Sequence, residues 1–413
     1  MAIRPEFEDI LRDIDGEAPD MIERVKAWSA VNSGSFNMPG LEAMADHIET
    51  AFAALGGEAE RLDADEVETV DAGGAVRKTP RGALYRLVKR PQAPYRVLLC
   101  GHMDTVFGVD HPFQSCRMLD DETLNAPGAA DMKGGLIVML HALKALEKSP
   151  FAEQVGYEVL INADEEIGSL GSARRLTEAA ERAHFGMVFE PALPDGTLAG
   201  ARKGSGNFTI IARGRAAHAG REHHLGRNAL VAVAEIVTRL DALNGLKPGV
   251  TVNPAKIEGG GPNNVVPDMA LCRFNIRVAS HEEAVWAEGR VRDIVAAASE
   301  KDGVSAELHG GFYRAPKPMD EKTEAFFNAV RDAGAELGLT VAWRATGGCC
   351  DGNNLAAAGL PVVDTLGVRG GAIHSAEEFV KLDSFAERAK LSALLLLKIA
   401  AGDIPCPGKI GAA

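Results

Sequence analysis

The order of hydrophobic and polar residues in the first half of the chain predicts a sheet covered by helices. Three apolar runs, YRVLLCGHMDTV (95–106), GYEVLINADEE (156–166) and FGMVFEP (185–191), are typical of strands buried on both faces. Around them, LEAMADHIETAFAALGG (41–57) and DMKGGLIVMLHALKALEKSP (131–150) have apolar residues at helical spacing. This alternation of strand and helix patterns predicts a doubly wound α/β domain with a mixed sheet.

A different pattern begins near residue 200. NFTIIARG (207–214) alternates like an antiparallel strand, and a helix pattern, two strands, a second helix pattern and a last strand follow it up to residue 311. This β-α-β-β-α-β order predicts a ferredoxin-like α+β domain. Helix patterns then resume. We therefore expect a catalytic domain in two parts, residues 1–199 and 312–413, interrupted by an inserted domain over residues 200–311.

Length and charge narrow the classes of function. At 413 residues the chain exceeds the size at which one hydrophobic core usually stops growing, which agrees with two domains. A formal net charge of −14 argues against nucleic acid or an anionic membrane as a partner. The first residues lack the apolar core of a signal peptide, and no apolar run is long enough to span a bilayer. We therefore expect a cytoplasmic protein.

Histidine and acidic residues lie where the predicted buried strands end, and one further acid and one further histidine lie in glycine-rich segments. The candidates are His102, Asp104, Asp131, Glu165, Glu166, Glu190 and His374. Alone, each has an ordinary interpretation, such as a hydrogen-bonded histidine or an acid that caps a helix. Together they are hard to explain without a cation, because unpaired carboxylates gathered at one sheet edge raise each other's pKa.

The residue types in this group suit a particular chemistry. Two imidazoles with three of the five carboxylates as ligands favour a pair of divalent ions, with Zn²⁺ first and Co²⁺ or Mn²⁺ as substitutes. The six cysteines are scattered and form no C-x-x-C pair, so neither a disulfide framework nor a thiolate zinc site is expected. Paired ions lie about 3.5–4 Å apart and make a shared water more acidic. A further carboxylate must then carry the proton to the leaving amine.

The motifs that hold these residues resemble a known family. In chain order they are GHMDTV, APGAADMKGG, NADEEIGSLGS, FEP, RAAHAG, GGGPNNVVP, CRFNIR, TGGCCDGNN and GAIHS. This series, which runs through almost the whole chain, resembles the M20 metallopeptidases and deacylases, particularly their glutamate carboxypeptidase branch. The resemblance implies a zinc-peptidase-like catalytic domain, and an inserted domain that serves for dimerisation or as a lid.

The resemblance also implies a role for each candidate in the metal centre. His102 and Glu190 resemble the ligands of one ion, Glu166 and His374 resemble those of the other, and Asp131 resembles the bridge between them. Glu165 resembles the general base that activates the water, and Asp104 resembles the acid that orients a metal-bound imidazole. In this family the peptide after the bridging aspartate is commonly cis, so a cis bond is expected between Asp131 and Met132.

On the substrate side, His218 in RAAHAG resembles a histidine of the inserted domain that stabilises the developing oxyanion. In dimeric relatives that histidine reaches the partner's active site, so a homodimer formed through the inserted domain is expected. Arg277 and Asn264 resemble residues that hold a free carboxylate of the substrate, a group that the planar fork of arginine matches. Arg277 alternates along its strand, however, and could instead be a solvated strand residue.

The segment TGGCCDG departs from the family pattern. Gly347 and Gly348 would let the backbone approach a ligand closely. Cys349 and Cys350 stand where small hydroxyl residues are usual, and either two buried thiols or a more apolar, redox-sensitive pocket wall would account for them.

We therefore expect a metal-dependent hydrolase of peptidyl or N-acyl amino acids that resembles a glutamate carboxypeptidase. Three alternatives remain open. One is an N-acyl-amino-acid deacylase of the acetylornithine or succinyl-diaminopimelate type. Another is a one-metal amidase or aminohydrolase that acts on a non-peptide metabolite. The last is a binding protein that has kept a hydrolase scaffold, against which the presence of Glu165 and of every expected ligand argues.

Overall fold

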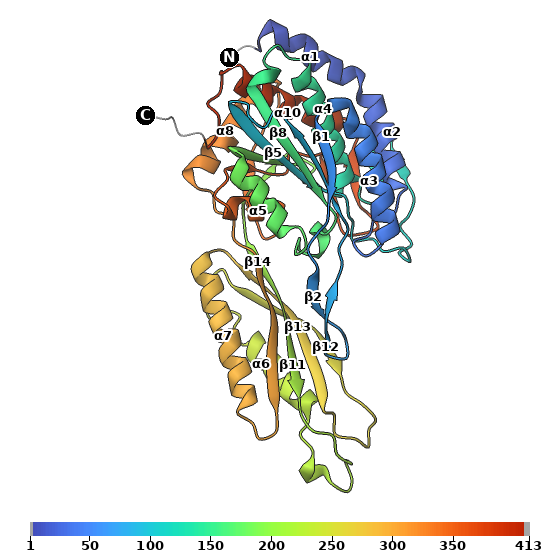
Figure 1. Ribbon diagram of the computed structural model, residues 1–413, viewed down its shortest axis with the longest axis vertical. Helices are drawn as coiled ribbons and strands as arrows, with labels where there is room; N and C mark the ends of the chain where they lie inside the picture. Colours follow the sequence, from blue (N-terminus) through green and yellow to red (C-terminus); the bar gives the residue numbers. More distant parts are fainter. Residues whose placement is uncertain (1–2, 409–413) are drawn as a thin grey trace.

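The computed structural model describes residues 3–408, and its larger domain is built on a six-stranded mixed sheet (Figure 1). The strand order is β1-β4-β8-β5-β9-β16, in which β5, β8, β9 and β16 run parallel while β1 and β4 pair antiparallel at one edge. The strands are β1 (Glu58–Leu62), β4 (Leu84–Lys89), β5 (Tyr95–His102), β8 (Val155–Asn162), β9 (Phe185–Val188) and β16 (Val362–Val363).

Helices cover both faces of this sheet, as alternation along β5 makes clear. Val97 and Leu99 join the large core on one face, whereas Leu98 and Cys100 join a smaller core on the other. The larger core includes α1 (Pro5–Gly16), α2 (Ala18–Ser29), α3 (Met38–Phe52), α4 (Gly134–Glu147), α8 (Glu321–Glu336) and α10 (Ser384–Ala400). The smaller core includes α5 (Ala173–Arg182) and α9 (Asp351–Ala357). The predicted doubly wound α/β fold is confirmed.

The second sheet is antiparallel and carries its own core. Its order is β12-β13-β11-β14, and α6 (Ala229–Asp241) and α7 (His281–Ser299) pack on one face. The strands are β11 (Gly204–Arg213), β12 (Thr251–Gly259), β13 (Met269–Val278) and β14 (Ser305–Arg314). Along the chain the elements follow the β-α-β-β-α-β order of a ferredoxin-like domain. The domain boundaries stay predictions, and β14 continues past the one placed at residue 311.

A hairpin that the sequence analysis did not anticipate links the two domains. It consists of β2 (Val67–Val70) and β3 (Val76–Thr79), and it runs from the larger domain along the smaller sheet (Figure 1). Arg273 Nη2 donates to Val70 O at 2.8 Å, and Arg213 Nη2 donates to Gly74 O at 2.8 Å. Both arginines lie on the face of the smaller sheet that α6 and α7 leave uncovered, because their neighbours in the strands face the helices.

Short elements complete the larger domain. One is a small sheet of order β17-β18-β7-β6, and another is a parallel pair, β10 with β15. They are β6 (Arg117–Asp120), β7 (Thr123–Asn125), β10 (Leu198–Arg202), β15 (Trp343–Thr346), β17 (Gly370–Gly371) and β18 (Phe379–Lys381), with single turns η1 (Ala53–Leu55), η3 (Ala152–Gln154) and η5 (His223–Leu225). All six cysteines are free. Within residues 3–408, no helix is both long and apolar enough to cross a bilayer.

Close packing of α4 on the sheet edge can be tested with a pair of glycines. A Cβ on Gly135, at the start of α4, would lie 1.9 Å from Phe189 O, whereas a Cβ on Gly289 in α7 would meet nothing within 4 Å. We expect Gly135→Ala to destabilise the protein by about 3 kcal/mol through overpacking. Gly289→Ala should stabilise it by about 0.5–1 kcal/mol through helix propensity. Calorimetric melting of both variants checks this, and equal effects would contradict the packing.

Candidate functional site

The carboxyl ends of three parallel strands converge on one edge of the larger sheet. His102 is the last residue of β5, Glu165 and Glu166 form the turn η4 (Glu165–Ile167) after β8, and Glu190 follows β9. Two other segments reach the same edge. Asp131 lies in the turn η2 (Ala129–Lys133) before α4, and the structure has the expected cis peptide between Asp131 and Met132. His374 lies in the loop between β17 and β18.

The first group of metal-ligating side chains consists of His102, Asp131 and Glu190, all of them buried. His102 Nε2 lies 3.1 Å from Asp131 Oδ1 and 3.8 Å from Glu190 Oε1. One ligand atom from each residue lies within 4.8 Å of the others, which is close enough for one shared cation.

The second group consists of Asp131, Glu166 and His374. His374 Nε2 lies 3.2 Å from Asp131 Oδ2 and 3.1 Å from Glu166 Oε2. The His374 side chain is 53% exposed, so this group opens toward solvent while the first is enclosed. Asp131 belongs to both groups and presents one carboxylate oxygen to each, which is the arrangement of a bridging ligand.

Burial makes this set of acids unfavourable without a cation. Burial and the neighbouring Asp131 raise the pKa of Glu166 to about 8. Burial, Asp131 and Glu165 raise the pKa of Glu190 well above its usual range. Burial opposes ionisation of Asp131 as well, but His102 and His374 hold its pKa below the usual range. Divalent cations remove such repulsion, and the imidazole and carboxylate donors fit them.

Asp104 connects the first imidazole to the turn of Glu165. His102 Nδ1 lies 3.0 Å from the backbone carbonyl oxygen of Asp104 and 3.4 Å from its buried carboxylate, which accepts a hydrogen bond from Ser35 Oγ at 2.7 Å. The same carboxylate accepts the backbone N–H groups of Glu165 and Glu166, at 3.1 and 3.2 Å. Asp104 therefore orients the imidazole, through its carbonyl and its carboxylate, and its carboxylate fixes the turn that holds a candidate base and a candidate ligand.

Glu165 lies beside the two groups without belonging to either, and its side chain is 8% exposed. Arg314 Nη2 binds Glu165 Oε1 at 2.7 Å and also donates to Ser169 Oγ at 2.7 Å. Glu165 Oε2 lies 4.0 Å from His102 Nε2 and therefore faces the metal ligands. Since Arg314 is the last residue of β14, the smaller domain supplies the partner of the candidate base.

The sequence analysis missed Arg314 and two buried acids. Glu378 accepts the backbone N–H groups of Gly128, Ala130 and Asp131 at 2.9–3.1 Å, and burial raises its pKa to about 7. Asp351 accepts hydrogen bonds from Asn162 Nδ2 at 2.5 Å and from Ser169 Oγ. Both acids lie in quoted motifs or directly after them, in TGGCCDGNN and after GAIHS, and that proximity is the one signal that could have found them.

Arg277, Gly347 and Gly348 lie toward the smaller domain. Arg277 and Gly348 line a cavity of about 260 Å³ together with Glu165 and His374. Arg277 Nη1 donates to Cys349 Sγ at 3.0 Å, and Arg277 Nε donates to Asn275 Oδ1 at 2.9 Å. The guanidinium therefore points toward the site and not into solvent.

His218 and Asn264 lie elsewhere, at the far end of the smaller domain. They are close to each other, since Ala219 N donates to Asn264 O at 2.9 Å and His218 bridges to Val265. Arg277 lies at the near end of the same sheet, and the strands between span about 30 Å. Within one chain, therefore, neither His218 nor Asn264 reaches the candidate metal ligands, and Asn264 does not lie beside Arg277.

The two adjacent cysteines differ. Cys350 is buried, and its Sγ caps α9 by accepting Gly352 N at 3.3 Å; burial raises the pKa of its thiol. The buried-thiol interpretation therefore holds for Cys350. Cys349 is partly exposed and lies between the guanidinium groups of Arg277 and Arg314, so it forms part of the cavity wall.

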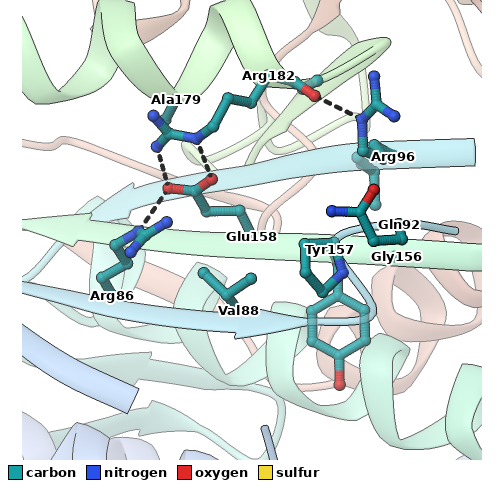
Figure 2. Close-up of a pocket in the computed structure, with 12 residues that line it drawn as sticks. Arg86, Val88, Gln92, Arg96, Gly156, Tyr157, Glu158, Ala179 and Arg182 are labelled. Atoms are coloured by element: carbon teal, nitrogen blue, oxygen red, sulfur yellow. Dashed lines mark hydrogen bonds and ion pairs between the residues drawn. The ribbon is translucent and has the colours of Figure 1, made fainter. Parts of the chain in front are cut away.

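Another cavity, of about 320 Å³, lies at the other end of the strands of the larger sheet, where β5 and β8 begin (Figure 2). Figure 2 shows Arg86 and Arg182 directed at Glu158, to which both donate. Because the charged groups here satisfy one another and no group of metal-ligating residues adjoins them, this cavity does not compete with the candidate site, as far as residues 3–408 show.

Known proteins are similar to this chain over most of its length. The model of peptidase family M20/M25/M40 matches residues 98–398. Carboxypeptidase G2 from Pseudomonas sp. (strain RS-16) is 26% identical over 402 residues, 94% of this chain and 91% of the relative. Succinyl-diaminopimelate desuccinylase from Marinobacter nauticus is 27% identical over 300 residues, 69% of this chain and 77% of the relative. The di-peptidase Dug1p from Saccharomyces cerevisiae shares the fold, with a TM-score of 0.73 at 15% identity over 96% of this chain and 98% of that chain.

The buried pair of Arg314 and Glu165 predicts a measurable stability effect. Arg314→Met leaves the Glu165 carboxylate buried without its cation, so we expect a loss of about 3 kcal/mol in the free energy of unfolding. Arg12→Met is the matched control, because Arg12 pairs with Asp9 on the exposed surface, and it should change stability by less than about 0.5 kcal/mol. Urea denaturation of the metal-free protein measures both. Equal losses would show that the buried pair is not special.

Proposed function

This chain belongs to peptidase family M20/M25/M40, and from that premise we propose that it hydrolyses the amide bond of peptidyl or N-acyl amino acids, as a glutamate carboxypeptidase does. One observation carries the proposal: Asp131 is shared by two histidine–carboxylate groups, with Glu165 beside them and in neither. Similarity to carboxypeptidase G2 over 94% of the chain supports the choice of substrate class.

In the proposed site, His102, Glu190 and Asp131 would hold one divalent ion, and Glu166, His374 and Asp131 would hold the other. Two bound ions, Zn²⁺ or in its place Co²⁺ or Mn²⁺, would supply Lewis acidity for the amide carbonyl and for a water molecule. The shared Asp131 and the raised pKa values of Glu166 and Glu190 support two ions over one.

Glu165 is the general base of the proposed reaction. Its Oε1 is bound by Arg314, which leaves Oε2, the oxygen that faces the metal ligands, to accept the proton of the attacking water. The same oxygen then returns the proton to the leaving nitrogen. Asp104 keeps the turn of Glu165 in place while this transfer occurs.

Arg277 binds the free carboxylate of the amino-acid half in this proposal. Its guanidinium faces the cavity and donates to the thiol of Cys349. A thiol is a weak acceptor, and the carboxylate of the substrate would replace it. Gly347 and Gly348 follow Thr346 at the end of β15 and leave the neighbouring wall without side chains.

A homodimer is part of the proposal. His218 and Asn264 lie at the far end of the smaller domain, so they can serve a reaction centre only if a second copy presents them. In the dimer, His218 of one copy would donate a hydrogen bond to the oxyanion formed in the site of the other, and Asn264 would help to hold the substrate.

A cytoplasmic location also stays a prediction.

A deacylase is the second candidate function. The similarity to succinyl-diaminopimelate desuccinylase, at 27% identity over 69% of this chain, favours it. Both reactions would use the same candidate ligands and base, so they differ in the acyl group and the amino acid that the site accepts.

The base and the metal centre can be separated by one substitution. Glu165→Gln should lower kcat by about a thousandfold or more, because proton transfer is lost, while metal content by mass spectrometry stays near that of the unaltered protein. Asp131→Asn is the contrasting variant, and it should lose metal as well as activity. The assay is release of amino acid from acyl- and peptidyl-glutamate, zinc-loaded against chelated. Loss of metal in Glu165→Gln would contradict its assignment as base.

Mixing of variants tests the shared site. Glu165→Gln and His218→Ala should each be nearly inactive as homodimers, His218→Ala by roughly a hundredfold or more for loss of an oxyanion donor. A heterodimer of the two holds one site with both residues intact, so activity should return after subunit exchange. Mixtures that stay inactive, although exchange is demonstrated by mass, would argue against a site completed by the partner.

A further inference from the structure

Two cavities meet at the candidate centre, and both include Glu165, Cys349 and His374. The cavity of Arg277 lies toward the smaller domain. The other, about 270 Å³, lies within the larger domain against β10 and β15. An amide extends in two directions from the bond that breaks. If Arg277 holds the amino-acid half, as the proposed function has it, the second cavity receives the acyl half. We call it the acyl-side cavity.

Behind the wall of the acyl-side cavity, cations outnumber anions. Arg202 Nε and Nη2 bind the fully buried Asp364 at 2.9 and 3.1 Å, and Lys317 Nζ lies 2.8 Å from the same carboxylate. Two buried cations therefore share one buried anion. The next carboxylate that acts on Arg202 is Glu190, a candidate metal ligand. An excess positive charge out of water is costly unless an anion balances it.

One nitrogen of Arg202 is free to donate into the cavity. Arg202 lines the acyl-side cavity, and within residues 3–408 its Nη1 makes no hydrogen bond. A Cβ added to Gly348 would lie 3.7 Å from that nitrogen. Since Gly348 has no side chain, the approach of a small ligand group to Nη1 stays open.

Arg344 provides a second guanidinium at the rim. It lies in β15, opposite Ala199 of β10, and lines the same cavity. In the described part of the chain it forms no ion pair within 4 Å. Arg344 acts electrostatically on the exposed Asp195. Hydrogen bonds from Thr197 make the largest contribution to lowering the pKa of Asp195, and the positive charge of Arg344 lowers it further. Apolar side chains line the same cavity, among them Leu193, Leu198 and Ile373.

We propose that the acyl-side cavity selects acyl groups that carry an anion of their own, and that Arg202 and Arg344 bind that anion. Apolar side chains of the same cavity hold the carbon chain that connects the anion to the scissile carbonyl. The substrate then has a negative charge at each end, one at Arg277 and one at the two arginines of the acyl-side cavity. The inference rests on the proposed hydrolysis, and the experiment distinguishes failure of the inference from failure of the proposed function.

The experiment compares N-succinyl with N-butanoyl derivatives of glutamate, alanine and lysine, which match in chain length and differ in terminal charge. The zinc-loaded protein should have a kcat/KM about tenfold higher for the succinyl derivatives, because their terminal carboxylate gains a hydrogen bond to a charged group that the butanoyl derivatives lack. Arg344→Glu should remove or reverse that preference, mainly through KM. Arg344→Lys should keep much of it. Calorimetry in the Glu165→Gln background measures binding without turnover.

Arg292→Glu is the matched control, because it makes the same charge change on the exposed surface of α7 and should leave the preference unaltered. Release of amino acid without preference for the succinyl series would overturn the inference and leave the proposed function standing. A preference that survives Arg344→Glu would remove Arg344 from the site and overturn it as stated. No chelator-sensitive release from any of the six compounds would overturn the proposed function, and the inference with it.

Discussion

Repulsion between buried carboxylates is the constraint on which the site depends. Asp131, Glu166 and Glu190 lie within reach of shared cations, and burial raises the pKa of the last two. They stay in place because other acids fix their backbone: Glu378 binds the amides that lead to Asp131, and Asp104 binds those of the turn that carries Glu166. The strands supply position, and these two buried acids supply orientation.

Local signals made the main sheet and the metal-ligand candidates predictable. An apolar run that ends in a polar residue identifies both a buried strand and its carboxyl end. His102 and Glu190 could therefore be placed at one edge of the sheet from the sequence alone. The switch from continuous to alternating hydrophobicity near residue 200 likewise predicted an antiparallel sheet. The roles of these residues came from resemblance to a family, since spacing along the chain does not distinguish a ligand from a neighbouring base.

Long-range contacts account for what could not be predicted. Nothing around Arg314 reveals that a strand of the smaller domain ends on Glu165, because that contact depends on how two domains meet. The distance of His218 from the metal ligands depends on the direction in which β11 leaves the larger domain, and motif order carries no such information. Hairpins such as β2–β3, with exposed strands and few apolar residues, leave only a weak pattern.

The β2–β3 hairpin has a mechanical consequence. The chain enters and leaves the smaller domain at one end, and a body attached there alone would be free to twist about its long axis as well as to tilt. The bonds from Arg213 and Arg273 to the hairpin carbonyls add a third support along the open face of the sheet. Twisting would shear both bonds, whereas tilting can carry the hairpin along. The hairpin thus ties the orientation of the smaller domain about its long axis to that of the larger domain.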